Sequence, residues 1–392
     1  MVKNNKKSLN IIIINITSMA NIKKKNVIIG IIVLIAISAV ILILFNPSFR
    51  GYLESQNELK ESHLIQRYEK VVSSLSFNLP DTSDQEKYLN MPNFLTRFGT
   101  CYYDAYASMM NYVENTSYDE FIWYGRPLMF QHYDSDFGVR LGPLRGELGW
   151  QAFHNLGYAR YCGNTKGKFA PASIMSYISP DKNYVFFKSG EEALEFIKKL
   201  MSAEHPVYLQ IKDWAKIPHF QTIFGYDETH IISPGIAHTP KINWLEKPLP
   251  EYYEQPLNDE YRENLTYKEF LEVWSPYGHE FCWLDKTGPS LSKKEIWELN
   301  KKDALEAPEN IQMIIDGQNK LSYQGEISDI HENGVISVAA ASRYLKQQGY
   351  NQLADKYMEI ATAFYANEGL SNIQKLYTEA ANLWENIDYI NK

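Results

Sequence analysis

The spacing of hydrophobic residues along this chain changes from a helical period to a strand period near residue 206. Residues 190–205 carry apolar side chains three and four positions apart, which predicts an amphipathic helix. After it, apolar residues alternate with polar ones in runs rich in β-branched and aromatic side chains, which predicts strands. We expect these strands at 206–211, 219–227, 230–233 and 279–284. In the second strand His219, Gln221 and Ile223 share one face, because side chains alternate across a strand.

Helical spacing recurs on both sides of these strands. A helix is expected from Thr100 to about Asn115, and Cys101 stands at its start. Shorter helices are expected at 146–157 and 266–274, and from about residue 306 the chain shows helical periods only. The pattern predicts an α+β protein. It would combine a helical lobe around Cys101, an antiparallel sheet carrying His219 and a C-terminal helical segment.

The N-terminal region has the pattern of a membrane anchor. Residues 26–45 contain no charge, and twenty such residues span a bilayer as a helix. Six lysines and no acidic residue lie within 1–25, so the positive-inside rule predicts a cytoplasmic tail there and an extracytoplasmic 46–392. The expected protein crosses the membrane once, and residues 46–90 form a stalk and lead-in. A cleaved signal peptide is the alternative, although no A-x-A-like site follows the run.

Charge and motif content exclude several classes of protein. The net charge is −8, and the N-terminal lysines make the remainder six units more negative. An acidic body gives no reason to expect nucleic-acid binding. No HExxH, CxxC, P-loop or GxGxxG pattern occurs, so neither a metal nor another cofactor is expected.

Cys101 and His219 are the candidate catalytic pair. A cysteine in the first turn of a helix faces unpaired backbone N–H groups and the positive end of the helix dipole, which favour thiolate over thiol. A histidine within hydrogen-bond reach would complete an activated nucleophile. On the pattern alone the structural alternatives stay open, because such a cysteine is often a small core residue and a strand histidine a buried core group.

Two segments carry a resemblance to a known superfamily. FGTCYYDAYASMMNYVE, residues 98–114, resembles the nucleophile helix of papain-like cysteine peptidases of the bacteriocin-leader-processing type. HPVYLQIKDWAKIPHFQTIFGYDETHIISPG, residues 205–235, resembles their second signature, with His-Phe followed by Gly-Tyr-Asp. Within this group the chain is most similar to the butirosin-biosynthesis acyltransferase family, which shares segments like SYDEFIWYGRPLMFQHY and C-terminal helices like residues 360–387. The resemblance covers roughly residues 95–390.

The resemblance implies a papain-like two-lobe fold in residues 91–305 and a C-terminal helical domain in 306–392. It makes Cys101 the nucleophile and His219 the general base that later protonates the leaving group.

The rest of the implied catalytic site departs from the family pattern. Ser233 stands where the family has an acid or an amide, and it would orient the imidazole without carrying a charge. Asn93 is the amide nearest before Cys101, where the family has a glutamine in the oxyanion hole. Asp227 is an alternative acid, although its place in the family is at the cap of a hairpin.

The odd number of cysteines bears on the nucleophile. Three cysteines leave at least one thiol unless one pairs with another chain. If Cys162 and Cys282 form a disulfide, Cys101 remains a thiol, as a nucleophile must.

Three functions remain open at this stage. The first is a membrane-anchored extracytoplasmic thiol hydrolase that acts on a peptide or acyl-amide through an acyl-enzyme. The second is an acyltransferase of the butirosin-biosynthesis type that uses the same Cys–His pair. The third is a non-catalytic surface protein on the same scaffold, whose C-terminal helices bind a protein partner.

Overall fold

The computed structural model describes residues 68–91, 101–130, 145–165, 183–212, 218–234, 262–317 and 324–390. The chain divides into two compact units, Met1–Gln66 and Arg67–Lys392, and all described residues belong to the second. None of the helices in those ranges is long and apolar enough to cross a bilayer. The predicted anchor at 26–45 and the stalk before residue 68 lie outside the described residues.

A five-stranded sheet lies at the centre of the described unit. In spatial order its strands are β3 (Tyr184–Phe186), β2 (Tyr158–Asn164), β9 (Phe281–Lys286), β4 (Val207–Lys212) and β5 (Pro218–Ile223). The strands β4, β5 and β9 were predicted, whereas β2 and β3 were not. Because β2 and β3 pair in parallel and all other neighbours pair antiparallel, the sheet is mixed and not purely antiparallel as predicted.

A second sheet of four strands takes up the rest of the predicted β-region. Its order is β1 (Lys87–Tyr88), β6 (Gly225–Tyr226), β7 (His230–Pro234) and β8 (Arg262–Thr266). The predicted strand 219–227 is therefore divided between two sheets, with β5 ending at Ile223 and Phe224 N–H donating to the carbonyl of Ile232 at 2.9 Å. Gly225 allows this passage, because a Cβ there would lie 2.7 Å from the backbone oxygen of Lys87.

Helices cover both faces of the central sheet. On one face lie α3 (Cys101–Glu114), α4 (Tyr118–Tyr124) and α5 (Arg145–Asn155); α6 (Gly190–Ser202) and α8 (Tyr267–Trp274) belong to the core on the other. The alternation along the strands divides the two cores, so Tyr208 and Cys282 join the α3 core while Leu209 and Trp283 join the α6 core.

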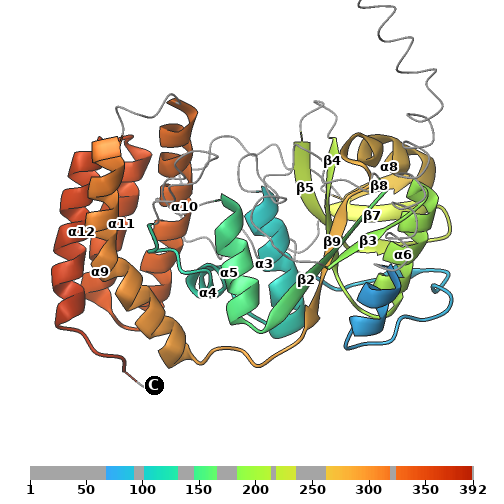
Figure 1. Ribbon diagram of the computed structural model, residues 1–392, viewed down its shortest axis with the longest axis horizontal. Helices are drawn as coiled ribbons and strands as arrows, with labels where there is room; N and C mark the ends of the chain where they lie inside the picture. The colour runs from blue at the N-terminus through green and yellow to red at the C-terminus, as the bar shows by residue number, and fades with distance from the viewer. Residues whose placement is uncertain are drawn as a thin grey trace, which may run out of the picture. The chain divides into compact units, whose positions relative to one another are not determined.

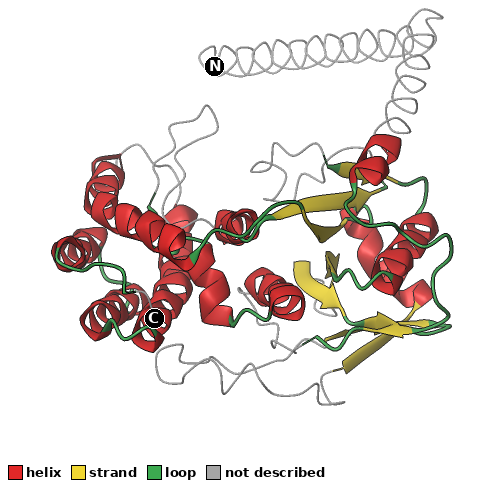
Figure 2. Ribbon diagram, turned by 90° about the horizontal axis from the view of Figure 1, so that it is seen from below, coloured by secondary structure: helices red, strands yellow, loops and turns green. Residues whose placement is uncertain are grey.

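Four helices form the C-terminal part of the unit. They are α9 (Lys293–Gly317), α10 (Gln324–Gln347), α11 (Asn351–Tyr365) and α12 (Leu370–Glu385). Here α10 packs against α11 and α9 against α12, and α10 also contacts α4. Figures 1 and 2 both show α3, α4 and α5 between these helices and the strands. The predicted helical segment is present, and its first helix starts at Lys293, before the boundary expected near 305.

Candidate active site

Cys101 is the first residue of α3, as the sequence predicted. It is a thiol and is buried, with 9% of its surface exposed. Its sulfur accepts a hydrogen bond from the backbone N–H of Phe220, 3.5 Å away on β5. Both the N-terminal end of α3 and this N–H therefore present positive partial charge to the sulfur.

Close packing fixes α3 against the central sheet. The ring of Tyr106 meets the ring of Tyr208 on β4 edge to face, with centroids 4.7 Å apart. Gly149 of α5 also lies against the ring of Tyr106, where any side chain would collide with it. The small residues Ala105 and Ser108 on the Cys101 face of α3 are both buried, which permits this close packing. The position of the Cys101 sulfur relative to β5 is thus set by the core and not by a loop.

His219 lies on β5, in register with Ile211 of β4. The structure describes its backbone, and its side chain lies outside the described part. The next residue, Phe220, is the one whose N–H reaches the Cys101 sulfur. The fold therefore places the residue next to the predicted base in hydrogen-bond contact with the predicted nucleophile.

The structure gives no contact between Cys101 and the other predicted catalytic residues, Asn93 and Ser233, within its described part. Asn93 lies outside the described residues. Ser233 is on β7, opposite Glu263 of β8, and is buried, and its hydroxyl oxygen has no hydrogen-bond partner. Because the His219 side chain lies outside the described part, the orienting role of Ser233 stays a prediction.

Asp227 has the structural role that was weighed against a catalytic one. One of its carboxylate oxygens accepts the backbone N–H groups of Thr229 at 2.7 Å and His230 at 2.8 Å, closing the turn between β6 and β7. The N–H of Thr229, followed by the other donors of this turn, lowers the pKa of Asp227. The hydrogen bonds of this carboxylate oxygen thus stabilise the hairpin turn.

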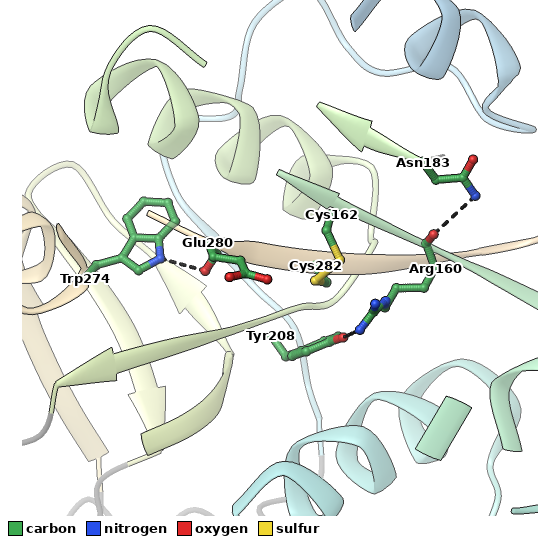
Figure 3. The surroundings of a disulfide bond; sticks show 7 residues. All are labelled: Arg160, Cys162, Asn183, Tyr208, Trp274, Glu280 and Cys282. Carbon is green, nitrogen blue, oxygen red and sulfur yellow. Dashed lines mark hydrogen bonds between the residues drawn. A yellow bond between two sulfur atoms is a disulfide. The ribbon is translucent and has the colours of Figure 1, made fainter. Parts of the chain in front are cut away.

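The hypothesis of a Cys162–Cys282 bridge is confirmed. The two residues are direct partners on β2 and β9, with Cα atoms 4.0 Å apart and the sulfurs bonded. The bridge lies on the face of the sheet that α3 covers, next to Tyr208, which is also in register with Cys282 (Figure 3). Cys101 is the cysteine that remains a thiol.

Sequence reasoning missed two polar residues on this same face. Gln210 of β4 is the register partner of Phe220. Glu280 immediately precedes β9, one step beyond the Leu209–Phe281 pair, so it neighbours Gln210 across the two strands. Gln210 is 7% and Glu280 9% exposed. The signal was available, because an acid two residues before Cys282 in an alternating apolar run must face the same way as that cysteine.

Burial dominates the electrostatics around Glu280. It raises the pKa of the Glu280 carboxyl to about 7, and the positive charge of Arg160 offsets only part of that effect. Arg160 Nη1 donates to the Tyr208 hydroxyl at 3.2 Å, on the far side of the disulfide from Glu280 (Figure 3). Burial also raises the pKa of Tyr208 and of Tyr106, so both phenols are neutral near pH 7.

Comparison with known proteins adds a distant structural resemblance. No protein-family model and no curated protein match the chain. The crystal structure of a putative C39-like peptidase from Bacillus anthracis aligns with 52% of this chain and 100% of that one, at 13% sequence identity and a TM-score of 0.28. A TM-score this low defines neither a shared fold nor a shared site, so the chemistry below follows from this chain's own residues. Within the described ranges no group of three or more His, Cys, Asp or Glu side chains could hold a metal ion.

Proposed function

We propose that this protein is a papain-like thiol hydrolase, a peptidase or amidase, with Cys101 as nucleophile and His219 as general base. One observation carries the proposal: the Cys101 sulfur, at the start of α3, lies 3.5 Å from the N–H of the residue that follows His219. The two segments are 119 residues apart in sequence. A cysteine buried only for packing needs neither the helix start nor a strand N–H aimed at its sulfur.

In the proposed reaction His219 removes the thiol proton, and the Cys101 sulfur attacks the carbonyl carbon of an amide. The C–N bond breaks, the amine leaves with the proton from His219, and a thioester joins the acyl group to the sulfur. Water, deprotonated by His219, then releases the acid and restores the thiol. In this scheme Asn93 and the backbone N–H of Cys101 would hold the oxyanion, and Ser233 would orient the imidazole.

Location favours hydrolysis over acyl transfer in this proposal. The Cys162–Cys282 disulfide is the kind of bond that persists in oxidising compartments, and this supports an extracytoplasmic domain behind an anchor at 26–45. Acyl-carrier thioesters are cytoplasmic, so such a domain would meet peptides and amides. The acyltransferase would use the same residues with an amine in place of water.

A non-catalytic binding protein is the second candidate. The buried Ser233 hydroxyl favours it, because this group carries no charge where the family has an acid or an amide, and it makes no hydrogen bond to any described side chain. In this alternative the C-terminal helices would bind a protein partner.

Alkylation of the thiol separates the candidates. At pH 6 an ordinary cysteine is less than about 1% thiolate, so an activated Cys101 should react with iodoacetamide at least about tenfold faster than glutathione. His219→Ala should abolish the difference, and His230→Ala, at a half-exposed histidine of the β6–β7 turn, should not. The measurement is the rate of mass gain on the peptide containing Cys101. A rate no greater than that of glutathione would rule out both enzymatic functions and leave the binding protein.

A further inference from the structure

A row of side chains crosses the central sheet and starts beside the nucleophile. Phe220, whose N–H touches the Cys101 sulfur, is in register with Gln210 on β4. One residue beyond the Leu209–Phe281 and Gly163–Phe281 pairs, Glu280 comes between Gln210 and Asn164. Strand spacing places Glu280 about 10 Å from Phe220 across the sheet. A long side chain near the acylated residue of a bound peptide, together with the side chain of Glu280, spans such a distance.

Gln210 and Glu280 are the polar residues of this row that lack bonds. Both are more than nine-tenths buried. Among the contacts of the described residues, neither the Gln210 amide nor the Glu280 carboxylate makes a side-chain hydrogen bond or an ion pair. Only the backbone of Glu280 is engaged, since its carbonyl accepts the indole N–H of Trp274 at 2.8 Å (Figure 3). Buried polar groups are normally paired, and an unpaired carboxylate on the sheet face that also carries the nucleophile points to a ligand.

Arg160, the cation whose charge acts on Glu280, does not satisfy this carboxylate. It is buried among tyrosines and donates to Tyr208, and the disulfide separates it from Glu280 (Figure 3). Its charge acts on Glu280 from a distance without a bond. The carboxylate therefore retains the capacity to accept charge-assisted hydrogen bonds from a second cation.

We propose that Glu280, with Gln210 beside it, forms a subsite that binds a cationic group of the substrate, a lysine or arginine side chain or a free amine. The subsite rests on the proposed function, because it places that cation near the acyl group held by Cys101. The acidic body of the chain would also attract a basic peptide.

The test uses tripeptides that end in an acyloxymethyl ketone, which alkylates a thiol as its carboxylate leaves. Each reagent carries either lysine, which is charged, or Nε-acetyl-lysine, which is neutral, at one of its three positions. At one position the lysine reagent should react with Cys101 about tenfold faster, the size expected of one charge-assisted hydrogen bond. Glu280→Gln should bring the ratio close to one. Glu272→Gln, an exposed acid on α8, should keep the preference.

The outcomes separate this inference from the proposed function. Equal rates for lysine and acetyl-lysine at all three positions, or a lysine preference that survives Glu280→Gln, would overturn the subsite while leaving Cys101 an active thiol. If Cys101 is unreactive, calorimetric titration with the same peptides as amides decides the matter. Tighter binding of the lysine peptide that Glu280→Gln removes would support the subsite, and equal binding would overturn it.

Discussion

At the scale of single residues, Glu280 is costly for the fold. In the unfolded chain its carboxyl loses its proton near pH 4.5, and in the folded protein near pH 7. Between these values the unfolded state holds fewer protons, so the free energy of unfolding falls as pH rises. Above pH 7 the loss is complete, at roughly 3 kcal/mol. The Glu280 carboxylate makes no hydrogen bond to a described residue that would offset this loss of stability. Such a loss is typical of a residue whose role is in binding.

Glu280→Gln should therefore stabilise the protein at pH 8 and have little effect at pH 4.5. The amide has a similar shape and no charge to desolvate, so the gain should grow through pH 5 to 7 and approach about 3 kcal/mol. Urea denaturation of the wild type and the variant at several pH values measures it, and the difference cancels all other titrations. Glu272→Gln is the control. A gain that is the same at every pH would show that desolvation is not its origin.

The site residues that could be predicted from the sequence differ from the missed ones in whether their role depends on local or on long-range structure. Cys101 and His219 stand out because each sits at a position with local chemistry, a helix start and a strand start. Glu280 and Gln210 acquire their meaning only from the register of β4, β5 and β9. Register depends on contacts between distant segments, which no local pattern contains.

At the scale of elements, amphipathic helices and alternating strands were predicted well because one buried face imposes the period. The strand β2 was missed because YARYCGN interrupts its apolar residues with Arg160 and Gly163, and its antiparallel partner β9 is distant in sequence. The helix α4 was missed because it is short. Its signal was the capping sequence Ser117 to Glu120, where the Ser117 hydroxyl accepts the N–H of Glu120.

Ion pairs with buried carboxylates join α4 and the turn after it to the C-terminal helices. Both carboxylate oxygens of Asp119 on α4 share the Nε–H of Arg343 on α10, and one of them also accepts its Nη2 at 2.7 Å. Arg126, just after α4, pairs with Asp303 on α9. Burial raises the pKa of Asp119 despite the nearby Arg343. Asp119→Asn should lower the free energy of unfolding by about 3–5 kcal/mol, because it leaves a buried guanidinium without its carboxylate.

Urea midpoints measure this loss, and two further variants make it specific. Replacing both partners, Asp119→Leu with Arg343→Met, should recover most of the stability because no buried charge remains. Glu306→Gln breaks the exposed Lys302–Glu306 pair and should cost less than about 1 kcal/mol. If Asp119→Asn costs no more than Glu306→Gln, the pair does not fasten the helices.

At the scale of the whole molecule, the disulfide links the stability of the domain to its compartment. It joins β2 and β9 across 120 residues of chain, and closing a loop of that length contributes about 4–5 kcal/mol in the chain-entropy model. A domain outside the membrane would keep this contribution, and the same domain in the cytoplasm would lose it. Loss of the disulfide would also weaken the pairing of β2 and β9, and with it the sheet face that carries Glu280 and faces Cys101.

The thiol count in cells tests this coupling together with the predicted topology. Acid-trapped cells expressing the full chain should show one cysteine that reacts with maleimide after denaturation, and three after reduction. Residues 46–392 expressed in the cytoplasm should show three in both cases, since thiols stay reduced there. Three reactive thiols in the trapped full chain would place the domain on the cytoplasmic side. That result would favour an acyl acceptor over water as the second substrate of Cys101, because acyl-carrier thioesters would then be within its reach.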